Sequence, residues 1–311
     1  MAKILITESV HPIGPELLTA AGHTVVYADR DMDIIRREIV DADAVLVRII
    51  ELPGSLLATA KNLKIVSKHG VGYDNIDLDY CKSHGVAVTI TPNANSLSVA
   101  EHAFTLMLTL AKNIIPVSNE YRTVGFAAKN HAPGIEMTGK TLGLIGMGRI
   151  GKHVLHMCKD GLDMHVIVYD PYISEVPEGV EKVDDLSELL RRADVVTLHC
   201  LLTDETRKLI DRERLALMKP TALLINCARG PIVDEAALIE ALENGRLAGA
   251  GLDVTDPEPV APDSPLFKLP NVIVTPHYAP TTVESATRVS KIAAENINAV
   301  LASKEPVGRI V

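Results

Sequence analysis

The stretch that decides the fold reads Gly143-Leu-Ile-Gly146-Met-Gly148-Arg-Ile-Gly151. Three of its glycines match the pattern G-x-G-x-x-G, with an apolar, strand-like run before them and a helical pattern after them. In such a turn the first glycine permits the sharp bend, the second lets the backbone approach a pyrophosphate, and the third lets helix and strand pack closely. The start of the helix also offers free N–H groups and a positive dipole to phosphates. The stretch therefore predicts a dinucleotide-binding turn made by Gly146, Gly148 and Gly151.

An acidic residue follows where a ribose ligand is expected. The next strand-like run, His165–Tyr169, ends at Asp170, which follows Gly146 at close to the interval of about 20 residues typical of these turns. A carboxylate there accepts hydrogen bonds from the ribose hydroxyls and repels the extra phosphate of NADP. Because Pro171 and Tyr172 come next and supply no arginine, the sequence predicts NAD. The structural alternative is a glycine-rich turn that binds nothing.

Composition excludes several other classes of protein. The chain has 311 residues, enough for about two domains. Its net charge of -9, its 3% aromatic content and its lack of tryptophan argue against nucleic acid as a partner. The four cysteines form no C-x-x-C pair, and no apolar run reaches the roughly 18 residues of a membrane span. We therefore expect a cytoplasmic protein with no metal site and no membrane partner.

Short apolar runs alternate with helical patterns along the whole chain. Continuously apolar strands separated by helices predict parallel sheets covered on both faces. The expected fold class is therefore α/β, with two doubly wound parallel-sheet domains. The strand-like runs cover residues 4–7, 44–47, 65–67, 86–90, 142–145, 166–169, 195–198, 222–225 and 272–275.

Two long helices are expected to shape these domains. The first runs over residues 98–115, because Ser98 and Glu101 form a capping-box pattern before an apolar stripe, and Pro116 marks its end. The second runs over about 282–302 and is expected to return to the first domain, which would make that domain discontinuous.

Three later segments carry residues suited to acid–base chemistry. Arg229, Glu258 and His277 each follow a strand-like run, at the end where open α/β sheets bind ligands. Imidazole can exchange a proton near neutral pH, a neighbouring carboxylate would favour imidazolium, and a guanidinium can hold a carboxylate with two parallel hydrogen bonds. Taken singly, each is more often an ordinary structural residue. Their shared location after a dinucleotide turn predicts hydride transfer involving a 2-keto acid.

The sequence resembles the D-isomer-specific 2-hydroxyacid dehydrogenases, and within them the phosphoglycerate dehydrogenase branch, over nearly its whole length. In that family the matching Arg, Glu and His are the catalytic set. The motifs that carry the resemblance are L-V-R at 46–48, G-V-G-Y-D-N-I-D at 70–77, T-P-N-A-N-S-L-S-V-A-E at 91–101, the glycine turn, N-C-A-R-G at 226–230, L-D-V at 252–254, E-P at 258–259 and P-H at 276–277.

The resemblance implies a domain organisation and an assembly. Residues 95–282 would form the NAD-binding Rossmann domain. Residues 1–94 and 283–311 would form a flavodoxin-like substrate domain, with the active site in the cleft between the two. The long helix would contribute to a homodimer interface, and the end of the sequence at Val311 leads us to expect a short form without a regulatory domain.

The resemblance also implies two sets of ligand contacts and a substrate class. The expected substrate is a small anionic D-2-hydroxy acid or its keto acid, such as 3-phosphoglycerate, glycerate or hydroxypyruvate. The expected cofactor-binding residues are Gly146, Gly148, Arg149, Ile150, Gly151, Asp170, His199, Cys200, Thr206, Cys227, Ala228, Asp253 and His277. The expected substrate-binding residues are Arg48, His69, Gly70, Val71, Gly72, Arg229 and His277.

Two other functions compete with this interpretation. Formate dehydrogenase shares the fold, but Glu258 stands where that enzyme is expected to carry glutamine. An NAD(H)-sensing corepressor-like binding protein could keep the same three residues, so turnover of a keto acid must separate it from an enzyme.

Overall fold

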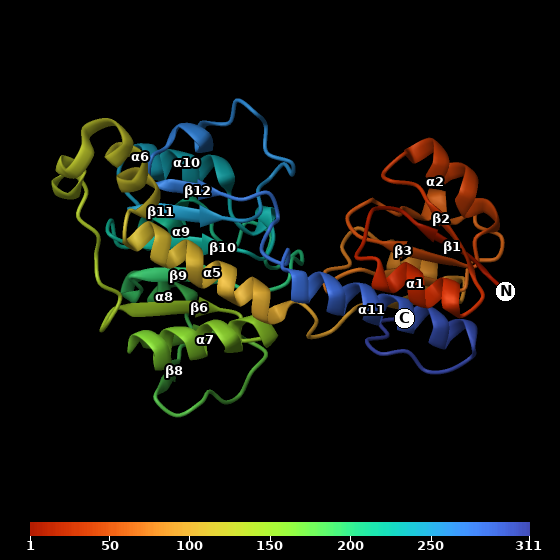
Figure 1. The fold of residues 1–311 in the computed structure, drawn as a ribbon. Coiled ribbons are helices and arrows are strands. Elements are labelled where there is room, and N and C mark those ends of the chain that lie inside the picture. Colours follow the sequence, from red (N-terminus) through yellow and green to blue (C-terminus); the bar gives the residue numbers. More distant parts are fainter. The chain divides into compact units, whose positions relative to one another are not determined.

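The apolar runs form two separate parallel sheets in the computed structural model, which describes residues 1–311 (Figure 1). The chain divides into two compact units. Unit 1 comprises Met1–Asn95 and Pro280–Val311, and unit 2 comprises Ser96–Ala279. These bounds lie close to the expected domain limits of 94/95 and 282/283. No helix is both long enough and apolar enough to cross a membrane.

Unit 1 has five parallel strands in the order β2-β1-β3-β4-β5, the flavodoxin-like order. Alternate residues of each strand face opposite sides. One face packs against α1 and α11, the other against α2, α3 and α4. The strands are β1 (Lys3–Ile6), β2 (Thr24–Tyr27), β3 (Ala44–Val47), β4 (Ile65–Lys68) and β5 (Ala87–Thr89), and the helices are α1 (Ile13–Ala20), α2 (Met32–Glu38), η1 (Ile39–Asp41), α3 (Gly54–Leu57), α4 (Leu78–Ser83) and α11 (Val283–Leu301).

Unit 2 has seven parallel strands in the order β12-β11-β10-β9-β6-β7-β8. The order reverses beside β6, so the switch point of a doubly wound sheet lies at the glycine turn that follows β6. The strands are β6 (Thr141–Ile145), β7 (His165–Tyr169), β8 (Val180–Lys182), β9 (Val195–Leu198), β10 (Leu223–Asn226), β11 (Gly249–Leu252) and β12 (Val272–Val274).

The helices of unit 2 cover both faces of its sheet. The helices α5 and α7 share one apolar core with the sheet, and α8, α9 and α10 share the other. The helical segments are α5 (Ser96–Ala111), α6 (Ile114–Val124), η2 (Gly125–Asn130), α7 (Arg149–Leu162), α8 (Leu186–Arg192), α9 (Arg212–Leu217), η3 (Gly230–Ile232), α10 (Glu235–Glu243) and η4 (Pro265–Lys268).

The long helix differs from its expected limits at both ends. It begins at Ser96, so Ser98 lies inside its first turn and not at the position before it. It ends at Ala111 because Asn113 adopts a left-handed conformation with φ of 50°. Pro116 instead lies in the first turn of α6, where its missing N–H leaves no helical hydrogen bond unmade.

Candidate active site

The glycine turn between β6 and α7 has the geometry that its sequence predicts. Gly146 has a φ of +89°, and an added Cβ would lie 2.8 Å from the backbone nitrogen of Cys200. A Cβ on Gly151 would overlap the carbonyl oxygen of Gly146, so this residue sets the close packing of helix on strand. Around Gly148 no atom lies within 4 Å of an added Cβ, and the backbone is open to an approaching group. The turn therefore fits a bound pyrophosphate.

Asp170 stands at the end of β7 and folds back onto this turn. Its carboxylate accepts hydrogen bonds from the backbone N–H groups of Met147, at 2.9 Å, and Tyr172, at 3.0 Å. The Tyr172 hydroxyl in turn donates to Glu205 at 3.0 Å, which links the loops after β7 and β9. The loop that carries Asp170 is thus tied to a second carboxylate, Glu205.

The loop after β9 carries His199, Cys200 and Thr206. The ring of His199 contacts Thr197 Oγ1 through Nε2 at 2.8 Å, and its buried Nδ1 has no partner in the protein. Burial lowers the pKa of His199 to about 3, so the ring stays neutral. Burial also raises the pKa of Cys200 to about 11, which keeps it a thiol. The unsatisfied Nδ1 is a polar group that a bound cofactor could satisfy.

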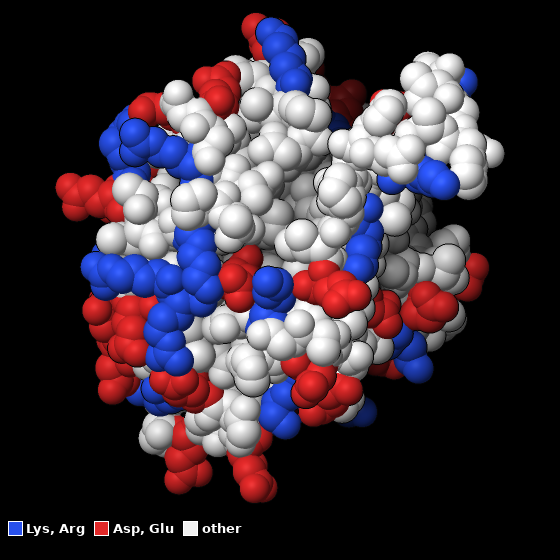
Figure 2. Space-filling view, turned by 90° about the vertical axis from the view of Figure 1, so that its left-hand side faces the viewer, with Lys and Arg blue, Asp and Glu red and all other residues white.

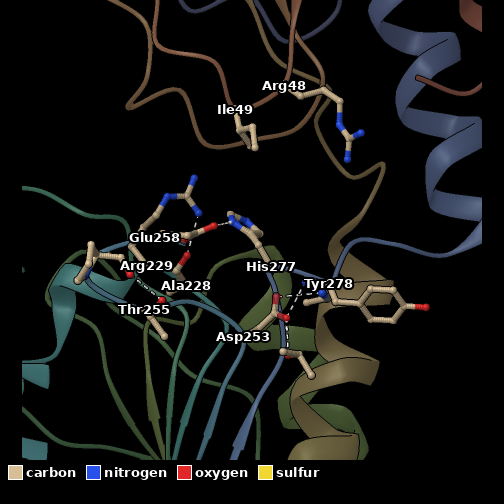
Figure 3. Close-up of polar contacts among 12 residues, drawn as sticks. Arg48, Ile49, Ala228, Arg229, Asp253, Thr255, Glu258, His277 and Tyr278 are labelled. Atoms are coloured by element: carbon tan, nitrogen blue, oxygen red, sulfur yellow. Dashed lines mark hydrogen bonds and ion pairs between the residues drawn. The ribbon is translucent and has the colours of Figure 1, made fainter. Parts of the chain in front are cut away.

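Figure 3 shows the group of residues at the carboxyl ends of β10, β11 and β12. His277 Nδ1 lies 2.6 Å from Glu258 Oε1, and the two side chains are 33% and 39% exposed. Because a carboxylate accepts this bond, Nδ1 carries the proton and Nε2 is the nitrogen left for a substrate. The contact therefore gives His277 the tautomer of a general base.

Arg229 lies in the loop after β10, and hydrogen bonds from neighbouring residues fix the conformation of this loop. Its Nη1 donates to the carbonyl of Ala228 at 2.8 Å. Asn226, the last residue of β10, donates to the Arg229 carbonyl at 2.9 Å and accepts from the Ala228 N–H at 3.0 Å. An added Cβ on Gly230 would overlap the carbonyl oxygen of Thr255, so the two loops are packed backbone to backbone. Cys227 is buried between Asn226 and Ala228.

Asp253 follows β11 and is only 1% exposed. Its Oδ1 accepts from the Tyr278 N–H at 2.7 Å, and its Oδ2 accepts from the Ala279 N–H at 2.9 Å. Its own carbonyl accepts from the His277 N–H at 2.8 Å. This placement favours a role in holding the His277 turn over direct contact with a cofactor.

In unit 1, Arg48 follows β3 on a loop fixed by a buried carboxylate. Glu8 is 1% exposed and accepts from the N–H groups of Arg48 at 2.7 Å and Ile49 at 2.8 Å. The buried Lys68 donates to the Arg48 carbonyl and, at 2.6 Å, to Asn75. The side chains of Glu8 and Lys68 thereby fix the backbone of the loop. The guanidinium of Arg48 donates one hydrogen bond, to the Ser9 carbonyl at 2.9 Å.

The other predicted substrate residues of unit 1 follow β4. Burial and the nearby cations Arg48 and Lys68 lower the pKa of His69 to about 3, and its buried Nε2 has no partner in the protein. Gly70 has a φ of +143°, a conformation that L side chains rarely adopt. Val71 and Gly72 are half-buried. These features suit a loop that contacts a ligand with backbone and imidazole.

The predicted site residues thus fall into two groups, each at the carboxyl edge of its own sheet. Every predicted cofactor residue lies in unit 2 together with Arg229, Glu258 and His277, whereas Arg48 and residues 69–72 lie in unit 1. Reasoning from the sequence missed Glu8, and it assigned no role to Asn226 or to Thr275. Only Asn226 carried a signal, because it opens the N-C-A-R-G motif.

Comparison with known proteins agrees with this geometry. Residues 104–279 match the family described as D-isomer specific 2-hydroxyacid dehydrogenase, NAD binding domain. The chain is 43% identical over 305 residues to D-3-phosphoglycerate dehydrogenase of Methanocaldococcus jannaschii, covering 97% of this chain and 58% of that protein. It therefore spans little more than half the length of that relative.

Two further proteins match over nearly their whole length. Glyoxylate reductase of Thermofilum pendens is 37% identical over 319 residues, which cover 98% of this chain and 93% of that enzyme. The crystal structure of the TT0316 protein from Thermus thermophilus matches with a TM-score of 0.91 at 34% identity, over 99% of this chain and 100% of that one.

Proposed function

Since the chain belongs to the D-isomer-specific 2-hydroxyacid dehydrogenase family, we propose that it interconverts a small anionic D-2-hydroxy acid and its 2-keto acid, with NAD as cofactor. The observation that carries the proposal is the 2.6 Å contact between His277 and Glu258, on the same sheet edge as Arg229 and the glycine turn. A dehydrogenase needs a group that accepts a proton, a cation that binds the substrate carboxylate and a site for the cofactor, and unit 2 carries a candidate for each.

The cofactor site is assigned to the glycine turn and Asp170. NAD, when bound, supplies the nicotinamide that accepts or returns the hydride at C2 of the substrate. Gly148 leaves room for the pyrophosphate, and Arg149 and Ile150 open α7, whose free N–H groups favour an anion. The carboxylates of Asp170 and Glu205 favour NAD over NADP.

His277 is the proposed acid and base. In oxidation its Nε2 takes the proton of the substrate hydroxyl while the C2–H bond breaks, and the ring becomes imidazolium. Glu258 stabilises that cation through Nδ1. In reduction the same Nε2–H returns its proton to the keto oxygen, so one residue serves both directions.

Arg229 is the proposed ligand of the substrate carboxylate. Its Nη1 donates to the carbonyl of Ala228, and this bond restricts the orientation of the guanidinium. A planar guanidinium binds a carboxylate with two parallel bonds, which a lysine cannot reproduce. The substrate is thereby oriented with its C2 oxygen toward His277.

The proposed substrates are 2-keto acids of the kinds that the names of the chain's relatives indicate. One relative is a D-3-phosphoglycerate dehydrogenase, which suggests a phosphorylated acid, and another is a glyoxylate reductase, which suggests an acid without phosphate. Arg48 is the residue that we expect to distinguish them, because it is the cation on the fixed loop after β3. Initial rates of NADH oxidation with glyoxylate, hydroxypyruvate and 3-phosphohydroxypyruvate test the assignment. At least one acid should turn over rapidly. Negligible turnover of all three, with NADH still bound, would favour the NAD(H)-sensing alternative.

We also propose a homodimer formed through α6 and η2. The helix α6 buries none of its residues within the chain, and Ile114, Tyr121 and Phe126 are 55%, 59% and 72% exposed. Figure 2 looks onto the side of unit 2 from which α6 extends in Figure 1, and broad uncharged areas lie on that side. Light scattering should give twice the chain mass, and Phe126→Glu should yield monomers. A monomeric wild-type protein would overturn this assignment.

A further inference from the structure

The backbone at His277 is held in an unusual conformation. Its φ is 53°, in the left-handed region that residues other than glycine seldom adopt. Asp253 holds the turn at this residue through three hydrogen bonds. Its carbonyl accepts from the N–H of His277, and its carboxylate accepts from the N–H groups of Tyr278 and Ala279. The direction in which the imidazole points therefore depends on where Asp253 is held.

Asp253 is in turn held by a chain of hydrogen bonds that starts on α5. Thr275 Oγ1 lies 2.6 Å from Asp253 Oδ1 and donates its only proton to that carboxylate. His102 Nε2 lies 3.0 Å from the same hydroxyl oxygen, which is left as an acceptor. His102 must therefore carry a proton on Nε2. That nitrogen also lies 3.5 Å from Asp253 Oδ1.

The buried carboxylate needs these donors. Asp253 is 1% exposed, so solvent cannot satisfy its oxygens, and an unsatisfied buried charge is costly. His102 comes from α5, which packs against β10, β11 and β12, and its ring also meets Tyr278 edge to face at 6.1 Å. The imidazole of His102 thus touches Thr275, Asp253 and Tyr278, the residues that surround the His277 turn.

We propose that His102 is a positioning residue for His277, and that it acts through Thr275 and Asp253. The proposal rests on the acid–base role assigned to His277. His102 touches neither Glu258 nor the glycine turn, so its loss should lower kcat and leave NADH affinity intact. Small displacements of a reacting group cost up to on the order of 10² in rate.

Three single variants test this proposal. His102→Leu removes the donor, His102→Gln restores an N–H at the end of a side chain of similar length, and His165→Leu makes the same change at the amino end of β7, away from the site. We expect kcat to fall about 10–100-fold in His102→Leu, to recover largely in His102→Gln, and to stay unchanged in His165→Leu. The Kd for NADH should be the same in all three.

Hydrogen exchange separates this proposal from the function on which it rests. The Tyr278 and Ala279 amides should exchange at least tenfold faster in His102→Leu, whatever role His277 has. In the His277→Ala background, adding His102→Leu should lower kcat no further. Unchanged exchange at both amides, or a kcat loss in His102→Leu that His102→Gln fails to recover, would overturn the positioning role. If His277→Ala keeps full activity while exchange still rises, the acid–base assignment fails and the positioning contact stands.

Discussion

Replacing Glu258 with glutamine removes the negative charge beside His277 and keeps the size of the side chain. The contact of 2.6 Å is a charge-assisted hydrogen bond, a class worth about 1.5–3 kcal/mol. Because the two side chains are 33% and 39% exposed, solvent screens their attraction and the lower end of that range applies. In hydroxy-acid oxidation the imidazolium forms in the transition state, so Glu258→Gln should cost about 1.5 kcal/mol, or about tenfold in kcat.

The assay is the initial rate of NAD reduction with a saturating D-2-hydroxy acid. The KM for NAD should stay within about twofold, because Glu258 is not assigned to the cofactor site. Glu240→Gln on α10, an exposed acid paired with Arg212, is the matched control and should leave kcat unchanged. A Glu258→Gln enzyme with the kcat of the wild type would refute the claim that Glu258 stabilises the imidazolium.

Three further changes follow from the same structure. Asp170→Ala should weaken NAD binding about 10–100-fold, since bonds to a charged group are lost, and should raise kcat/KM for NADP relative to NAD; unaltered selectivity would show that Asp170 is not the ribose ligand. Gly230→Ala should lower the free energy of unfolding by about 3 kcal/mol in denaturant titration, because its Cβ would overlap the Thr255 carbonyl, and equal stability would contradict that packing. Burial lowers the pKa of His199 from 6.5 to about 3, so below pH 6.5 the unfolded chain binds a proton that the folded protein does not. The His199 ring should therefore contribute about 1.4 kcal/mol per pH unit to the fall in the free energy of unfolding as pH drops toward 3, beside a similar share from His69, and His199→Gln should lessen the slope by the His199 share; parallel pH curves would argue against a neutral buried ring at position 199.

The sequence predicted most of the strands, including β5 and β12 at sheet edges, and missed β2, β8 and the interior strand β11. Strands such as β9 are fully buried, so their apolar runs stand out. The strands β2 and β8 lie at sheet edges with partly exposed residues, which weakens the pattern. The strand β11 reads Gly-Ala-Gly-Leu and lacks β-branched residues, because an added Cβ on Gly251 would lie 3.0 Å from Leu106 of α5.

Within the site, the sequence predicts features made by neighbouring residues and misses contacts between distant ones. Gly146, Gly148 and Gly151 perform a local task within a few residues, so their spacing alone predicts it. The bond between His102 and Thr275 joins residues that are 173 positions apart and follows from the packing of α5 on β12. No local pattern encodes such a contact, and only the fold reveals it.

Transfer of deuterium from NADH that carries deuterium at both C4 positions to a 2-keto acid in a single turnover tests the central claim most directly. The wild-type protein should give the D-2-hydroxy acid with deuterium at C2. In His277→Ala the rate should fall by on the order of 10²–10⁴, with the Kd for NADH unchanged. Transfer at equal rates in both proteins, or no deuterium in the product of either, would contradict the account.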